Sequence, residues 1–252
     1  MITSAVAGML CYWMTVAAAP LQPVPPDLLP AMVKFDRVYI PTLAMTSQGN
    51  VDGANKAVKR LVTYWEDFRG RFYNAYPGDE EWKPNFDQIG ESIAKGADII
   101  TSGGDLKAAH EALERVRQVF WKLRARNGVP YYIDRLTAYH EPMEAIVLAA
   151  MENEKMKLSP ADRAALQTNL KKAETRWRAV LNTPFNAELF GFDDQEVASM
   201  KRLIANESKA LSDLATALQS GDDKEIIQKA KAIKAPFAQL FMSFGSFEGM
   251  GS

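Results

Sequence analysis

The chain has 252 residues, of which 47% are hydrophobic and 24% charged, and its formal net charge is −1. This length fits one or two domains, and the composition is apolar enough for a real core, which excludes an intrinsically disordered chain. The near-zero net charge excludes a strongly basic protein, so we expect no nucleic-acid partner. The single cysteine, Cys11, excludes a disulfide framework and any cysteine-based zinc or iron–sulfur centre.

The first 30 residues differ in character from the rest of the chain. Residues 5–19 form an apolar run that is too short for a comfortable membrane span and ends in small residues suited to signal peptidase. We therefore expect residues 1–19 to be a signal peptide and the protein to be exported to the periplasm. An uncleaved N-terminal anchor is the alternative, and membrane contact is expected only in that case. Residues 20–30 contain five prolines and are predicted to be an extended spacer.

From residue 31 onward the apolar side chains recur at helical spacing, and no segment alternates with the period of a strand. Residues 31–128 are predicted to form four helices, and residues 129–252 another four, separated by breaks rich in glycine and proline. The fifth helix is expected to run from about Tyr132 to Lys155, residues 183–192 are expected to form a loop, and the eighth helix is expected to be a single one that contains Ile226 and Leu240. Four helices joined by short connections form an up-down bundle. The sequence therefore predicts an all-α protein built from two tandem four-helix bundles.

Short motifs recur in the same order in the two predicted bundles, and the offset between them grows along the chain. The aligned pairs are residues 59–65 with 171–177, residues 104–107 with 221–224, Phe120 with Phe237, and Tyr39 with His140. This pattern predicts an internal duplication. The layout resembles haem-free relatives of cytochrome-type bundles and tandem-bundle periplasmic proteins such as imelysins. The resemblance implies architecture only, because glutamates follow His140 at +1 and +4 and no imelysin-type H-x-x-E signature is present.

The fifth predicted helix carries polar groups on its apolar stripe. His140 lies on that stripe, Met143 and Glu144 follow on the same face, and Pro142 frees a backbone carbonyl one turn earlier. Glu207 lies on or near the buried stripe of another helix, where a carboxylate needs a cation or hydrogen bonds. The predicted metal ligands are His140, Met143, Glu144 and Glu207, and the expected ion is copper or iron. The alternative is that His140 only hydrogen-bonds to the freed carbonyl or to a carboxylate.

Two further groups of side chains receive simpler interpretations. His110 and Glu114 are i,i+4 neighbours that we expect to form ion pairs on a solvated helix face. Antiparallel packing would separate His110 from His140 by about seven residues, on the order of 10 Å, so the two histidines are predicted to lie in separate sites. Haem between His140 and Met242 is disfavoured, because Met242 falls off its apolar stripe. The Phe-rich residues 241–247 are expected to pack, with a docking patch as the alternative.

No glycine-rich phosphate loop, zinc-protease motif or serine-hydrolase motif occurs in the sequence, and no nucleophile–base pair can be named from spacing. Because these motifs are absent, we expect a binding function rather than an enzymatic one. We expect an exported, non-enzymatic binding protein that holds a metal ion in the second bundle. The alternative is a structural or adaptor subunit of an envelope complex, with a protein partner and no ligand.

Overall fold

The computed structural model describes residues 23–152, 157–220 and 222–249, and all regular structure in these ranges is helical. The helices are α1 (Leu28–Ser47), α2 (Val51–Phe72), α3 (Trp82–Thr101), α4 (Leu106–Arg126), α5 (Ile133–Met151), α6 (Pro160–Asn182), α7 (Ala187–Phe190), α8 (Asp194–Ser220), α9 (Asp223–Ala232) and α10 (Lys234–Met242). The all-α prediction is therefore confirmed. Within the described ranges, no helix combines the length and apolarity that crossing a bilayer requires. The predicted signal peptide, residues 1–19, lies outside the described residues.

Helices α1 to α4 pack into one group, in which α1 pairs with α2, α3 pairs with α4, and α1 also contacts α4. Aromatic rings fill the space between them. The Phe68 ring lies 6.0 Å from the ring of Phe86 and 5.7 Å from that of Phe120. Phe35 lies 5.1 Å from Phe120 and 6.2 Å from Trp65. Large aromatic side chains bury much apolar area, so this cluster contributes strongly to the stability of the first group.

The second group contains α5, α6, α8, α9 and α10, with α5 against α6 and α8 against α9 and α10. The single helix predicted at the C-terminal end of the chain is in fact two helices. Pro236 explains the break, because its ring clashes with the carbonyl four residues earlier, on Ala232, which is the last residue of α9. The loop predicted at residues 183–192 contains the short α7, which Asn186 caps by accepting a hydrogen bond from the backbone N–H of Leu189.

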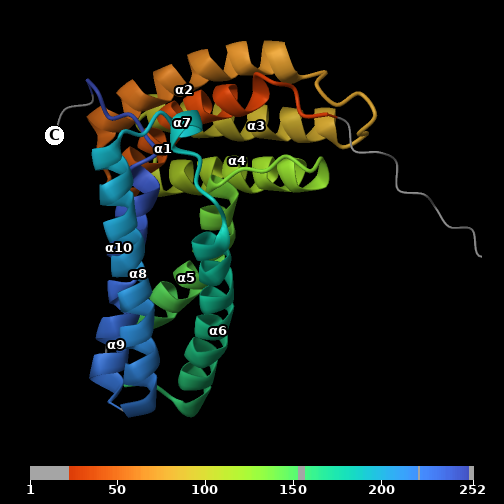
Figure 1. Ribbon diagram of the computed structural model, residues 1–252. Coiled ribbons are helices and arrows are strands. Elements are labelled where there is room, and N and C mark those ends of the chain that lie inside the picture. Colours follow the sequence, from red (N-terminus) through yellow and green to blue (C-terminus); the bar gives the residue numbers. More distant parts are fainter. Residues whose placement is uncertain (1–22, 153–156, 221, 250–252) are drawn as a thin grey trace, which may run out of the picture.

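The two groups of helices run in different directions, with α5, α6, α8, α9 and α10 steeply inclined to α1 to α4 (Figure 1). Contacts between α1 and α10, α1 and α7, and α4 and α5 join them. The Phe-rich C-terminal segment strengthens this junction. Phe244 is buried with its ring 5.2 Å from the ring of Phe190, and Ser246 donates its backbone N–H to the carbonyl of Arg37. The segment is therefore packed, as expected, and the alternative of a docking patch is wrong for Phe244.

Two predicted boundaries need correction. Helix α1 begins at Leu28, so residues 28–30 are helical and do not belong to an extended spacer. Pro30 lies in the first turn of α1, where a backbone N–H has no helical partner and its loss costs nothing. Helix α5 ends at Met151, before the predicted end at Lys155, and residues 153–156 lie outside the described ranges.

The close approach of α3 to α4 depends on Gly96, which gives a first testable prediction. A Cβ atom on Gly96 would lie 2.7 Å from Cγ of Leu113, whose side chain is fully buried. We expect Gly96→Ala to lower the free energy of unfolding by about 1–2 kcal/mol in urea denaturation, because overpacking outweighs the gain in helix propensity. Gly70→Ala is the matched control in α2, where nothing lies within 4 Å, and it should be neutral or stabilising. Equal effects of the two substitutions would contradict the prediction.

Candidate functional site

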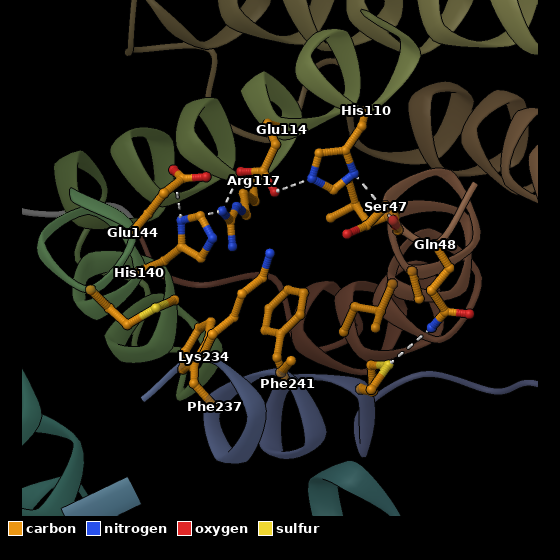
Figure 2. Close-up of a pocket in the computed structure, with 16 residues that line it drawn as sticks. Ser47, Gln48, His110, Glu114, Arg117, His140, Glu144, Lys234, Phe237 and Phe241 are labelled. Atoms are coloured by element: carbon orange, nitrogen blue, oxygen red, sulfur yellow. Dashed lines mark hydrogen bonds and ion pairs between the residues drawn. The ribbon is translucent and has the colours of Figure 1, made fainter. Parts of the chain in front are cut away.

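A pocket of about 220 Å³ lies between the two groups of helices (Figure 2). Helices α1 and α4 form one side of it, and α5 and α10 form the other. Its apolar lining is Ile40, Leu43, Ala44, Met143, Phe237, Ala238, Phe241 and Met242, and its polar lining is Ser47, Gln48, His110, Glu114, Arg117, His140, Glu144 and Lys234. Each helix contributes residues at i, i+3, i+4 or i+7, which is the spacing of side chains on one helical face.

Helix α4 supplies a row of three polar side chains to this pocket. Nδ1 of His110 lies 3.1 Å from the carbonyl oxygen of Leu43 and must donate to it, since a carbonyl only accepts. Nε2 of the same ring lies 3.5 Å from Oε1 of Glu114, and the other oxygen of Glu114 pairs with the guanidinium of Arg117. The expectation of a solvated helix face is therefore wrong, because this face of α4 is turned toward α1 and the pocket.

Arg117 is the most deeply buried charge in the pocket, with 5% of its surface exposed. Its Nη2 atom pairs with Glu114 and also lies 2.7 Å from Nδ1 of His140. The guanidinium carbon sits 5.5 Å from the centre of the Phe241 ring, within the range of a cation–π contact. Its Nε–H is buried and has no hydrogen-bond partner among the described residues. An unpaired buried donor is costly, so this group has hydrogen-bonding capacity left over.

His140 is held as a neutral ring. Its Nδ1 faces a guanidinium that can only donate, so Nδ1 accepts and the ring proton resides on Nε2. Burial lowers the pKa of His140 to about 2, and the positive charge of Arg117 acts in the same direction. Glu144 lies one turn further along α5, with Oε2 3.7 Å from Nδ1 of His140. Burial raises the pKa of Glu144, and the nearby carboxylate of Glu114 raises it further.

Lys234 extends from the first turn of α10 toward the middle of the pocket, and its amine points at the space between Arg117 and His110 (Figure 2). Within the described ranges it makes no ion pair. Its positive charge contributes to the lowered pKa of His140, which places the ammonium close to that ring. Arg117 therefore has a carboxylate partner in the pocket, whereas Lys234 has none among the described residues.

Three of the four predicted metal ligands, His140, Met143 and Glu144, line the pocket, but Glu207 does not. Its Oε1 accepts a hydrogen bond from the hydroxyl of Tyr139 in the core of the second group. Consecutive residues on a helix point about 100° apart, so a carboxylate that meets Tyr139 faces away from the side of α5 that carries His140. The expected set of four ligands is not brought together. In the part of the chain that the structure describes, no group of three or more His, Cys, Asp or Glu side chains is arranged to hold a metal ion.

His110 and His140 line the same pocket, so the prediction of separate sites is wrong. A separation of about seven residues along the helices, on the order of 10 Å, does not prevent one pocket from reaching from His110 to His140 past Glu114 and Arg117. Sequence reasoning also missed Arg117 and Lys234. One signal for Arg117 was available, because it lies four residues after the buried Leu113 and next to the buried Val116, where a charge is uncommon.

Comparison of the chain with family models, with curated proteins and with solved structures gave no match. The interpretation of the pocket therefore rests on its own geometry and chemistry.

Proposed function

We propose that this protein is a binding protein for a small organic molecule, held in the pocket between its two groups of helices. The observation that supports the proposal is the pocket itself: a space of about 220 Å³ with an apolar lining and a few converging polar side chains. Ligand sites in proteins combine these two features, since apolar walls supply affinity and a few polar groups fix orientation. Helical bundles commonly build such sites between facing helices.

The size of the pocket limits the ligand. An engineered, apolar protein cavity of about 150 Å³ holds benzene. A pocket of about 220 Å³ has room for one ring, or a short acyl chain, together with one small polar substituent. The rings of Phe237 and Phe241, both from α10, offer flat apolar surfaces to such a group.

The other functional hypotheses from the sequence stay predictions. A metal ion is less well supported than an organic ligand, because a metal-bound histidine normally donates its second ring N–H to an acceptor. His140 does the reverse, since its Nδ1 accepts from Arg117. The adaptor role and export to the periplasm are untested.

Filling the pocket provides the test. Ala238 lines it, and we expect Ala238→Phe to abolish binding of small fluorinated aromatic probes. The probes are 4-fluorobenzoate, 4-fluorobenzamide and 4-fluorobenzylamine, and the measurement is broadening of their ¹⁹F NMR signals by the full chain. Ala235→Phe is the matched control, because Ala235 is exposed on the same helix and does not line the pocket. Failure of all three probes to bind the native protein, or equal binding to both variants, would refute the proposed site.

A further inference from the structure

The pocket is lined by two cations, Arg117 and Lys234, and two carboxylates, Glu114 and Glu144, but these four charges are paired unevenly. Arg117 and Glu114 form an ion pair on one helix, three residues apart. Glu144 has 54% of its side chain exposed, and its Oε2 lies 3.7 Å from Nδ1 of His140. Lys234 remains as an ammonium group that points into the pocket without a carboxylate partner among the described residues (Figure 2). The ammonium of Lys234 is therefore available to a ligand, which competes for it with Glu144, the carboxylate whose pKa Lys234 lowers.

Hydrogen-bond donors are also in excess on this side of the pocket. Nδ1 of His140 accepts from Arg117, so the Nε2–H of His140 is free to donate. The ammonium of Lys234 brings three donors. The guanidinium of Arg117 lines the same space, although its unpartnered Nε–H is buried and is not one of the donors that a ligand can reach. A carboxylate accepts several such hydrogen bonds at once and carries the matching charge.

We propose that the ligand is a small monocarboxylate with an apolar body, whose carboxylate is bound by Lys234, Arg117 and His140 and whose body packs against Phe237 and Phe241. This inference rests on the proposed function, because it specifies the class of molecule that occupies the same pocket. A phosphate ester at neutral pH carries close to two negative charges and would meet the carboxylates of Glu114 and Glu144 with only one unpaired cation to offset them. A singly charged carboxylate fits the available charge better.

The test compares probes of one shape and different charge. We expect 4-fluorobenzoate to bind the native protein at least about tenfold more tightly than neutral 4-fluorobenzamide, since a hydrogen bond between charged groups is stronger than one between neutral groups. The cationic 4-fluorobenzylamine should bind more weakly than the amide, and 4-fluorophenyl phosphate more weakly than the benzoate. Dissociation constants from ¹⁹F NMR titration decide each comparison.

Lys234→Gln should weaken benzoate binding by about tenfold and leave amide binding unchanged. Lys231→Gln is the matched control, because Lys231 is exposed on the preceding helix and lies outside the pocket. Equal affinity for benzoate and amide, or an unchanged benzoate affinity in Lys234→Gln, overturns the carboxylate assignment while the pocket remains a ligand site. If none of the probes binds, both proposals are overturned. If the amine or the phosphate binds most tightly, the carboxylate assignment is overturned and the ligand belongs to that other class.

Discussion

Replacing Asp134 with alanine should lower the free energy of unfolding by about 3 kcal/mol, because the substitution leaves Arg124 as a buried charge without its partner. Arg124 is 4% exposed and Asp134 7% exposed. Nε of Arg124 donates to both carboxylate oxygens of Asp134, at 3.1 and 2.9 Å, and Nη2 pairs with Oδ1. The loss can be measured by urea denaturation at neutral pH.

The position of this ion pair makes it important for the shape of the molecule. Arg124 lies in the last turn of α4 and Asp134 in the first turn of α5, so each charge also has the sign that its helix end favours. The pair therefore stabilises the junction at which the chain passes from one group of helices to the other. Asp36 lies close enough to Arg124 to feel its charge and accepts a 2.6 Å hydrogen bond from Tyr131. Its presence keeps the expected loss at the lower end of the range for buried pairs, about 3–5 kcal/mol.

A surface pair of similar length provides the control. Arg71 and Asp27 are 2.8 Å apart, but the Asp27 side chain is 57% exposed, so Asp27→Ala should cost less than about 1 kcal/mol. A double variant, Arg124→Met with Asp134→Leu, should recover much of the stability, because an apolar pair removes the uncompensated charge. A loss below about 1 kcal/mol in Asp134→Ala would mean that the charge of Arg124 is satisfied by other groups.

The helices were predictable from the sequence because amphipathic periodicity and strong end signals agreed. Ser159 and Asp162 illustrate this, since they form a reciprocal capping box at the start of α6. The division of the last helix was missed although Pro236 was visible, because the apolar stripe continues through the break. The direction of α5 relative to α4 could not be derived, since it depends on the junction and on the packed C-terminal segment rather than on any local pattern.

The residues of the pocket were only partly predictable for the same reason. Three residues of one face, His140, Met143 and Glu144, could be named because helical spacing fixes them. Their partners on α4 and α10 depend on how the two groups of helices meet. The sequence placed Glu207 at a suitable height along the bundle but next to the wrong side of α5. Helical periodicity shows how far along a bundle a residue lies more reliably than it shows which neighbouring helix face the residue meets.

The alignment of the two halves also shifts when the contacts are compared. In the second group, the Tyr139 ring lies 4.8 Å from Trp177 and 5.4 Å from Phe237. In the first group, the ring on the first helix, α1, that contacts both aligned positions, Trp65 and Phe120, is Phe35. These contacts pair Phe35 with Tyr139, and therefore Asp36 with His140, rather than Tyr39 with His140. The duplication stays a prediction, but each half then has a polar side chain, Asp36 or the partly buried His140, at the corresponding position of its first helix.

Replacing Glu207 with glutamine should stabilise the protein increasingly as the pH rises, by about 3 kcal/mol in total between pH 4.5 and pH 8 relative to the native chain. Glu207 is fully buried, its Oε2 has no hydrogen-bond partner among the described residues, and its Oε1 accepts from Tyr139. Burial raises the pKa of Glu207 from 4.5 to about 7, and the hydrogen bond from Tyr139 limits the rise.

The direction of this effect follows from proton uptake. Between pH 4.5 and pH 7 the folded state keeps Glu207 protonated while the unfolded state releases the proton, so rising pH favours unfolding. The contribution of the neutral carboxyl is complete below pH 4.5 and is lost once the pH passes about 7. Glutamine has nearly the same shape, retains an acceptor for the Tyr139 hydroxyl and does not titrate, so the variant avoids this loss.

Only the difference between variant and native protein isolates Glu207, because His140 titrates with the opposite sign. The pKa of His140 is lowered to about 2 in the folded state. Below pH 6.5 the unfolded state therefore binds a proton at this residue that the folded state does not bind, so falling pH favours unfolding. The two groups partly cancel in the native curve but not in the difference, since both proteins retain His140. Tyr139→Phe removes the only side-chain donor to Glu207 among the described residues and should steepen the native pH dependence. A difference between Glu207→Gln and the native chain that stays constant with pH would show that the buried carboxyl is already ionised and solvated in the folded state.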